Sequence, residues 1–390
     1  MKDVNLNGKK VIIRVDFNVP LDANGAITDD TRIQAALPTI QYILEQGASL
    51  IIMSHLGRPK GEAKPEFSLK PCAVRLGELL DNEVHFINDC IGAEVEKAAA
   101  ELQPGDVLML ENTRFHNEEK KNDDEFSKKL ASLADVYVND AFGSAHRAHA
   151  STEGITKYAA VSVAGFLLEK EIQYLANTLA SPEKPFVVIV GGAKVSSKLN
   201  VFQNLLDKVD CFLVAGGMAY TFLKSKGLPI GRSLIETEME VDAFNIMKEA
   251  HAKEVDFRLP LDHVVVEEIK DDAKLNIVGL NGIQDNQAAV DIGPKTIADF
   301  KKVIAKAKTI VWNGPMGIFE IDNFAKGTFE VAKALAASKA KTIVGGGDSV
   351  AALKKAGLTD KITHVSTGGG ASLEMLEGKL LPGLAALDDK

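Results

Sequence analysis

The sequence predicts an α/β protein of two similar-sized domains, each a parallel β-sheet covered by helices, separated by a cleft and a hinge. Short β-rich runs alternate with segments of helical period throughout the chain, which is the pattern of a parallel sheet with crossover helices. The length of 390 residues also exceeds the size at which one hydrophobic core usually keeps growing. Two such domains are therefore expected.

The domain boundary is expected near the middle of the chain. Residues 165–179 have a helical pattern, and the run Ser181-Pro182-Glu183-Lys184-Pro185 that follows is typical of a linker. We expect an N-terminal domain over residues 1–170, a connecting helix and linker over 171–185, and a C-terminal domain over 186–370.

Three local patterns add detail to this plan. A helix should begin at Asp30-Thr31 and end at Gly47, with Pro38 inside it. Asn24-Gly25 indicates a hairpin turn, and residues 263–290 indicate a small antiparallel excursion.

The composition excludes several classes of protein. The net charge of −9 disfavours nucleic acid and anionic membrane as partners. The first residues lack the apolar region of a secretory signal, and no apolar stretch is long enough for a transmembrane helix, so we expect a cytoplasmic protein. Cys72, Cys90 and Cys211 are widely spaced, which supports neither a disulfide framework nor a zinc site.

In the N-terminal half, arginine and histidine residues follow the ends of apolar runs. Ligands of open α/β sheets bind outside the carboxyl ends of the strands, and guanidinium groups bind carboxylate and phosphate bidentately. Each side chain alone could instead be ion-paired at the surface, and the histidines could be structural. We expect this half to bind a small, multiply charged anion. The candidate binding residues are Arg32, His55, Arg58, Arg114, His146, Arg147 and His149.

Asp16 and Asn18 lie two residues apart on an emerging strand, so their side chains share a face. A carboxylate and an amide can together accept from and donate to a substrate hydroxyl. The alternative is a turn stabilised by both side chains.

In the C-terminal half, glycines follow the apolar runs. The run from Gly191 to Lys198 should open a helix, with free backbone N–H groups for phosphate and with Lys194 and Lys198 on one helix face. It does not match the P-loop pattern. Because glycine-to-helix junctions also occur at residues 345–349 and 367–370, we expect a phosphate chain to bind here.

Three polar side chains extend this expected phosphate site. Asp348, at a helix start beside a glycine loop, suits a magnesium ligand, although it could be a helix cap. Asn313 and Glu320 follow another predicted strand, where a sugar hydroxyl or a base could reach them.

The chain resembles the phosphoglycerate kinase family over nearly its whole length. Its motifs occur in the family's order, and the ordered set is far more specific than any member alone: RVDFNVP, SHLGRP, ENTRF, DAFGSAHRAH, GGAKVSSK, VWNGPMGIFE, GGGDS and STGGGASLE. One departure is Ser349, where the family most often has threonine; the hydroxyl remains. The resemblance also implies a monomer whose C-terminal tail, residues 371–390, returns to the N-terminal domain.

The resemblance implies two sets of binding residues. For 3-phosphoglycerate or 1,3-bisphosphoglycerate it implies Asp16, Phe17, Asn18, Arg32, His55, Leu56, Gly57, Arg58, Arg114 and Arg147. For Mg²⁺ with ATP or ADP it implies Gly192, Lys194, Lys198, Gly216, Gly217, Gly293, Asn313, Glu320, Gly346, Gly347, Asp348 and Ser349, with Asp348 as the metal ligand.

The implied reaction is phosphoryl transfer between ATP and a carboxylate. Its transition state is loose, so positioning and charge neutralisation dominate, and no general base is needed because the acceptor is already ionised. The expected catalytic groups are Arg32, Lys194, Lys198, Gly346 and Gly369. Two alternatives stay open: a kinase acting on acetate or aspartate, and a hinged two-domain protein that only binds a sugar or an anion.

Overall fold

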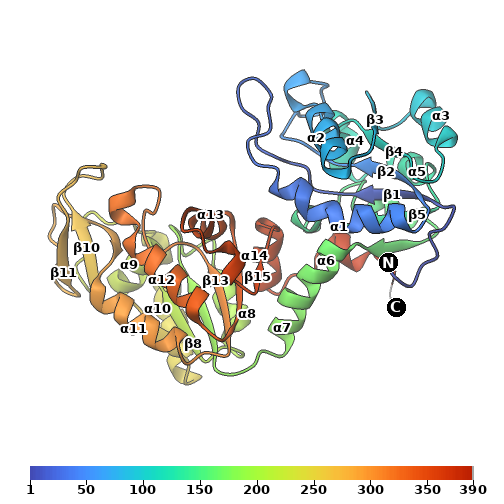
Figure 1. Ribbon diagram of the computed structural model, residues 1–390. Helices are drawn as coiled ribbons and strands as arrows, with labels where there is room; N and C mark the ends of the chain where they lie inside the picture. The colour runs from blue at the N-terminus through green and yellow to red at the C-terminus, as the bar shows by residue number, and fades with distance from the viewer. Residues whose placement is uncertain (389–390) are drawn as a thin grey trace. The chain divides into compact units, whose positions relative to one another are not determined.

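The structure is a computed structural model that describes residues 1–388. Its contacts divide the chain into two compact units: Met1–Ile172 with the C-terminal tail from Leu380 onward, and Gln173–Lys379 (Figure 1). The chain therefore passes between the units twice. Of the tail expected over residues 371–390, residues 371–379 belong to the second unit, residues 380–388 belong to the first, and residues 389–390 lie outside the described part.

Six parallel strands form the sheet of the first unit, in the order β3-β4-β2-β1-β5-β6. The strands are β1 (Lys10–Arg14), β2 (Ser49–Met53), β3 (Val84–Ile87), β4 (Val107–Leu110), β5 (Val136–Asn139) and β6 (Ser162–Ala164). The helices that precede β6 are α1 (Thr31–Glu45), α2 (Lys70–Leu80), α3 (Ala93–Glu101), α4 (Asn117–Lys121) and α5 (Asp124–Ala131).

Helices cover both faces of this sheet. Val11 and Ile13 of β1 pack with the α1 and α2 side chains, whereas the intervening Ile12 packs with those of α3 and α5. Alternate strand residues point to opposite faces, so a strand covered on both sides is apolar throughout. The predicted parallel sheet with helices is confirmed here.

The second unit repeats this architecture with the order β15-β14-β13-β7-β8-β9, again all parallel. The strands are β7 (Phe186–Val190), β8 (Cys211–Val214), β9 (Asp256–Arg258), β13 (Thr309–Asn313), β14 (Lys341–Gly345) and β15 (His364–Val365). The helices are α8 (Leu199–Leu205), α9 (Met218–Ser225), α10 (Glu240–Ala252), α11 (Pro294–Ile304), α12 (Lys326–Ala337), α13 (Gly347–Lys355) and α14 (Gly370–Leu376).

Aromatic side chains fill much of this second core. Trp312 is fully buried among side chains of α11, α12 and α13 on one face of the sheet. Phe202, Phe212, Phe222 and Phe257 contact one another, from α8, β8, α9 and β9. Aromatic pairs of this kind stabilise a core by more than the burial of their apolar area alone would.

A three-stranded antiparallel sheet accompanies the large sheet of the second unit. Its order is β11 (Asn276–Gly279), β10 (Asp262–Val266), β12 (Ala288–Ile292). This confirms the antiparallel excursion expected over residues 263–290. The helix expected from Asp30-Thr31 to Gly47 is also confirmed as α1, and the turn at Asn24-Gly25 is closed by an antiparallel bridge between Leu21 and Ile27.

The helical pattern over residues 165–179 is confirmed as α6 (Phe166–Glu171), a π-helical turn (Ile172–Ala176) and α7 (Asn177–Ala180). The first passage between the units falls inside the π-helical turn. The second lies before α15 (Pro382–Ala385), where the amide of Asn139 donates to the Gly383 carbonyl at 2.9 Å. Each crossing is thus a single covalent connection.

Candidate functional site

The predicted anion-binding residues of the first unit follow β1, β2, β4 and β5, whose carboxyl ends lie at one edge of the parallel sheet. Arg32, at the start of α1, pairs with Asp16 at 2.5 Å. The other Asp16 oxygen accepts the Asn18 backbone N–H at 3.3 Å. Phe17 is fully buried, and its N–H donates to Ser54 Oγ at 2.8 Å, so the Asp16 and Asn18 side chains are held on the site side.

Gly57 connects this group to Arg114. Its N–H donates to Asn18 Oδ1, and its carbonyl accepts from Arg114 Nη1, both at 2.9 Å. A β-carbon at Gly57 would lie 2.3 Å from the Phe67 ring, and the backbone φ there is +61°. Only glycine fits this junction without rearrangement. The neighbouring Leu56 is buried and accepts from the Asn112 amide through its carbonyl.

A cavity of about 260 Å³ lies at this edge of the first unit. It is lined by Arg58, Pro59, Lys60, Arg114, Lys120 and Arg147. Arg114 Nε is buried without a hydrogen-bond partner among the described residues. Five cations around one small cavity, with an unmatched buried donor, form a site that a polyvalent anion would complete.

A buried network supports this site, and the sequence analysis did not find its centre. Arg14, at the end of β1, is fully buried; its Nε donates to Ser151 Oγ at 2.8 Å and its Nη2 lies 2.9 Å from His55 Nδ1. Ser151 Oγ donates in turn to Glu119 Oε1 at 2.6 Å. Arg14 lies in a continuous apolar run, so the signals that could have marked it as functional were its charge within that run and its place as the first residue of the motif RVDFNVP.

The electrostatics of the first unit favour a bound anion. Burial, followed by Arg14 and Arg114, holds the pKa of His55 well below its usual value. Burial, Arg114 and Arg14 lower the pKa of His149 to about 3. Both imidazoles are therefore neutral at physiological pH, because further positive charge is unfavourable among so many guanidinium groups.

The second unit has a cavity of about 310 Å³ at the carboxyl ends of β7, β13 and β14. It is lined by Gly191, Gly192, Ala193, Ser197, Lys198, Asn313, Gly314, Gly346, Gly347, Asp348, Ser349, Gly369, Gly370 and Leu373. The glycines leave backbone N–H groups of the α13 and α14 N-termini accessible, which is the arrangement that binds phosphate. Asp348 is exposed in the first turn of α13.

Lys198 and Asn313 provide the buried polar groups of this cavity. Lys198 Nζ donates to Asn313 Oδ1, while Asn313 Nδ2 is buried without a partner among residues 1–388. Burial lowers the pKa of Lys198 to about 8, although Glu377 and Asp348 act in the opposite direction. Ser349 is buried, and its Oγ accepts the Gly314 N–H at 2.6 Å.

The expected helix opening at residues 191–198 is wrong. Lys198 is the N-cap and α8 begins only at Leu199, so Lys194 and Lys198 do not share a helix face. The Glu236 carboxylate accepts from the Ser196 N–H at 3.0 Å and from its hydroxyl at 2.5 Å, which holds this segment as a loop. Lys194 is consequently exposed and does not line the cavity.

Four other predicted residues also lie outside the cavity lining. Gly216 and Gly217 lie against the Gly192 segment, where a β-carbon on Gly216 would be 2.6 Å from the Gly192 nitrogen. Gly293 is the N-cap of α11, and Glu320 is exposed. The structure thus brings Gly192, Lys198, Asn313 and residues 346–349 together around one cavity, and it leaves Gly216, Gly217, Gly293 and Glu320 outside the lining of that cavity.

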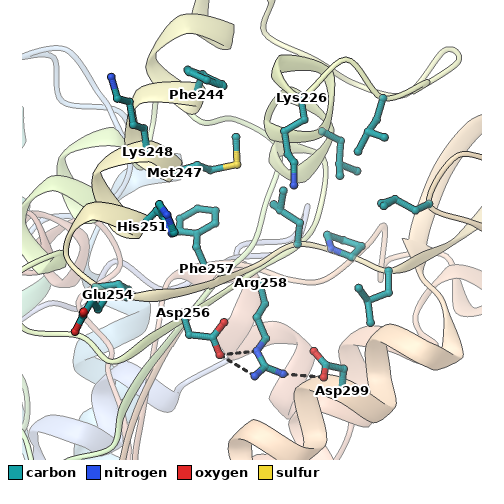
Figure 2. Close-up of a pocket in the computed structure, with 17 residues that line it drawn as sticks. Lys226, Phe244, Met247, Lys248, His251, Glu254, Asp256, Phe257, Arg258 and Asp299 are labelled. Atoms are coloured by element: carbon teal, nitrogen blue, oxygen red, sulfur yellow. Dashed lines mark hydrogen bonds and ion pairs between the residues drawn. The ribbon is translucent and has the colours of Figure 1, made fainter.

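A larger cavity of the second unit, about 1040 Å³, lies elsewhere, along the edge strand β9 (Figure 2). It is lined mainly by apolar side chains such as Phe244, Met247 and Phe257. Its one arginine, Arg258, is paired with Asp256 and Asp299, both at 2.7 Å. None of the predicted site residues lines it.

Two parallel-sheet units, each with a cavity suited to phosphate at the carboxyl ends of its strands, form the arrangement expected of a small-molecule phosphotransferase. The family model for phosphoglycerate kinase matches residues 1–379. The chain is 57% identical over its full length to the phosphoglycerate kinases of Chlorobium luteolum, of which it covers 98%, and of Moorella thermoacetica, of which it covers 99%.

Solved structures agree. The phosphoglycerate kinase from Coxiella burnetii aligns with a TM-score of 0.92 and 46% identity, over 99% of this chain and 97% of that one. The enzyme from Pyrococcus horikoshii OT3 aligns with a TM-score of 0.83 and 37% identity, over 99% and 98%. The chain belongs to the phosphoglycerate kinase family, whose members are glycolytic kinases with a carboxyl group as phosphoryl acceptor.

Among residues 1–388, no helix combines the length and the apolar character needed to cross a bilayer. The three cysteines are all free and buried.

Proposed function

We propose that this chain catalyses reversible, Mg²⁺-dependent phosphoryl transfer between 1,3-bisphosphoglycerate with ADP and 3-phosphoglycerate with ATP. One observation carries the assignment of the sites: each cavity contains a buried nitrogen donor with no partner among the described residues, Arg114 Nε in the first unit and Asn313 Nδ2 in the second. Unmatched buried donors are costly, and the phosphate oxygens of the two substrates would satisfy them.

The first unit is proposed to bind 3-phosphoglycerate. Its cavity offers Arg58, Arg114 and Arg147 to the phosphate group, since guanidinium forks match phosphate oxygens bidentately. Asp16 and Asn18 would hold the substrate hydroxyl as acceptor and donor. His55 would act through Arg14, which it contacts. Phe17, Leu56 and Gly57 would hold the backbone that positions the substrate-binding side chains.

The second unit is proposed to bind the nucleotide. The N–H groups near Gly192, Gly346, Gly347 and Gly369 would hold its phosphate chain, with Lys198 and Asn313 beside them. Gly216, Gly217, Gly293 and Glu320 would then border the ribose and base. Asp348 is exposed at the cavity, so its carboxylate fits a Mg²⁺ that also binds phosphate oxygens.

The chemistry then follows from charge. A carboxylate oxygen of 3-phosphoglycerate forms a bond to the γ-phosphorus of ATP, the bond to the β,γ-bridging oxygen breaks, and ADP leaves. Arg32, Lys194, Lys198 and the backbone N–H groups at Gly346 and Gly369 would neutralise the charge on the transferring group. Bound Mg²⁺ would supply further charge neutralisation at the phosphate oxygens.

A coupled assay tests this proposal. With Mg²⁺, 1,3-bisphosphoglycerate and ADP should yield ATP, whereas acetyl phosphate or aspartyl phosphate should be poor donors because neither provides a second phosphate for the arginines. ATP formation from acetyl or aspartyl phosphate at an equal rate would contradict the assigned substrate. Binding of both ligands without turnover would favour a binding protein instead.

We further propose that the protein works as a monomer in the cytoplasm and binds neither nucleic acid nor membrane. Its acidic net charge supports this. Sedimentation equilibrium should give a mass near 41.9 kDa.

A further inference from the structure

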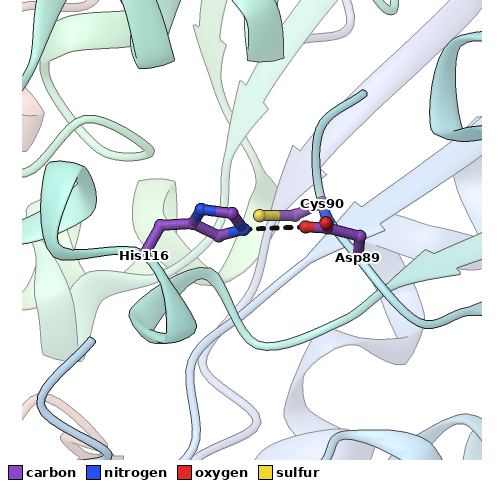
Figure 3. Close-up of side chains that lie close together, drawn as sticks. All are labelled: Asp89, Cys90 and His116. Carbon is purple, nitrogen blue, oxygen red and sulfur yellow. Dashed lines mark hydrogen bonds and ion pairs between the residues drawn. The ribbon is translucent and has the colours of Figure 1, made fainter. Parts of the chain in front are cut away.

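Asp89, Cys90 and His116 lie together in the first unit, apart from the residues assigned to the substrate. Asp89 and Cys90 follow β3, and His116 comes shortly after β4, the neighbouring strand. One possible ligand atom of each residue lies within 4.8 Å of the other two. Figure 3 shows the carboxylate, thiol and imidazole directed toward one another.

Two hydrogen bonds hold the two loops together. His116 Nε2 and Asp89 Oδ1 are 2.7 Å apart, and the Glu111 backbone N–H donates to the Asp89 carbonyl at 3.2 Å. The His116 ring also packs against Phe126, with ring centroids 5.2 Å apart. The imidazole and the carboxylate are therefore positioned by the surrounding fold.

The Cys90 thiol differs from those of the other two cysteines. The Cys72 and Cys211 thiols each donate to a backbone carbonyl at 3.7 Å. Cys90 is only 1% exposed and packs in an apolar cluster with Val95 and Leu110. A buried sulfur facing an imidazole and a carboxylate has the polar partners of a ligand, which a purely space-filling cysteine does not need.

The surrounding charge is negative. Burial, followed by the carboxylates of Asp89, Glu119 and Glu111, raises the pKa of the Cys90 thiol well above its usual value. A thiolate alone would be unfavourable here, whereas a divalent cation would compensate both the thiolate and its neighbours.

We propose that Asp89, Cys90 and His116 bind a thiophilic divalent cation, Zn²⁺ being the best match, with water as a fourth ligand. Thiolate and imidazole ligands select zinc, whereas Mg²⁺ prefers oxygen, so this site is distinct from that of the nucleotide's ion. Ligand atoms on one Zn²⁺ lie roughly 3 to 4 Å apart, so on binding the His116–Asp89 pair, now 2.7 Å apart, would open slightly, and ligand atoms as far apart as 4.8 Å would approach by about 1 Å. As the metal–sulfur bond forms, the thiol proton leaves to solvent.

Metal titration of the full chain, stripped of metal by a chelator, tests the site. One equivalent of Co²⁺ should produce a thiolate-to-cobalt charge-transfer band in the near ultraviolet, and Zn²⁺ should displace it. Cys90→Ser should abolish the band, and Asp89→Asn and His116→Gln should each weaken Zn²⁺ binding about tenfold or more.

Matched controls exist in the same chain. Cys211→Ser removes another buried thiol, and His85→Gln removes an exposed histidine whose Nδ1 lies 3.4 Å from a Glu83 carboxylate oxygen and which is not part of the cluster. Both should retain the band and the Zn²⁺ affinity. Each variant is first compared with the unsubstituted chain by circular dichroism.

Three results would overturn the proposal: no charge-transfer band in the unsubstituted chain, a band that survives in Cys90→Ser, or an equal loss in the controls. If Cys90→Ser does not fold, the variants of the partly exposed Asp89 and His116 still test the proposal. An unchanged Zn²⁺ affinity in both Asp89→Asn and His116→Gln would refute the site. The measurement does not depend on phosphoryl-transfer activity.

Discussion

Arg32 and Arg58 are both proposed to contact substrate, but they should differ in kinetics. Arg32 is proposed to face the transferring phosphoryl group, so Arg32→Ala should lower kcat on the order of 100-fold with a smaller change in KM. Arg58 lines the anion cavity, so Arg58→Ala should mainly raise KM for 3-phosphoglycerate. Steady-state kinetics in both substrates provides the measurement.

Arg75 provides the control for this pair. Its guanidinium is bound by Asp30 and Glu78 at 2.9 and 2.7 Å, and it lines neither cavity. Arg75→Ala should leave both kinetic constants within about twofold, since surface ion pairs contribute little. The role assignments fail if Arg58→Ala lowers kcat and Arg32→Ala raises only KM.

Lys198 should make nucleotide binding depend on pH. Burial lowers its pKa to about 8, and bound phosphate would raise that pKa again because it favours the ammonium form. Binding therefore takes up a proton above about pH 8, so the affinity for Mg-ADP should fall as pH rises through that value, at most about tenfold per unit. Calorimetric titration at several pH values measures the slope.

Two variants isolate this effect. Lys198→Arg keeps its charge at every pH and should flatten the profile, while Lys226→Arg, in the large cavity along β9, should retain the slope. If the Mg-ADP affinity of Lys198→Arg changed with pH as steeply as that of the unsubstituted chain, the pH dependence would come from the nucleotide phosphates alone.

For single residues, the sequence motifs predicted which side chains form the site more successfully than they predicted the contacts that surround those side chains. Arg58, Arg114 and Arg147 were predicted from their positions after strands, and they do meet around one cavity. Arg14 was missed because it lies inside an apolar run, where spacing carries no functional signal. The Asp89, Cys90 and His116 cluster was missed because its members come from two loops far apart in the sequence.

Among the elements, the junction between β14 and α13 depends on the backbone of Gly346. Its φ is +91°, and a β-carbon would lie 3.1 Å from Asn313 Nδ2. Gly346→Ala should therefore displace the Asn313 amide and raise KM for the nucleotide about tenfold. The strained φ should also cost about 1 to 2 kcal/mol of folding stability.

Gly357, just beyond the other end of α13, separates these two effects. It too has a positive φ, +65°, but a β-carbon there would meet nothing within 4 Å. Gly357→Ala should lower the thermal midpoint comparably and leave the nucleotide KM unchanged. Equal KM changes in both variants would mean that the loss at Gly346 reflects general destabilisation.

Periodicity predicted elements well where apolar residues recur regularly, as in α1, and poorly where side-chain bonds override local preference. Residues 193–198 have glycines before them and an apolar stripe after them, which favoured a helix. The Ser196 bonds to Glu236, 40 positions away, stabilise a loop instead. Such distant partners leave no local signal in a sequence.

At the scale of the whole molecule, alternation of strands and helices predicted both sheets, but not the point at which the tail changes units. Leu381 is buried and Gly383 is hydrogen-bonded to Ala145, which joins the last described residues to the first unit. This contact joins residues more than half the chain length apart, so no periodic pattern could place it.

The proposed substrates bind to different units, so transfer requires that the reacting atoms be brought to roughly 3 to 3.5 Å. The two covalent connections, one of them through the π-helical turn Ile172–Ala176, must allow this approach. Each substrate alone contributes only part of the free energy that favours a closed state. Small-angle scattering should show the largest fall in radius of gyration with 3-phosphoglycerate and a Mg-nucleotide together.

Smaller falls, or none, are expected with either ligand alone, because one ligand supplies only part of the free energy of closure. Closure with both reactants bound would also exclude water from the phosphoryl group. Arg75→Ala should behave like the unsubstituted chain in this experiment, and Arg58→Ala should need more 3-phosphoglycerate to reach the same radius. A radius that stays constant in the saturated, active ternary complex would mean that transfer needs no closure, and the units would then have to meet the distance requirement before any ligand binds.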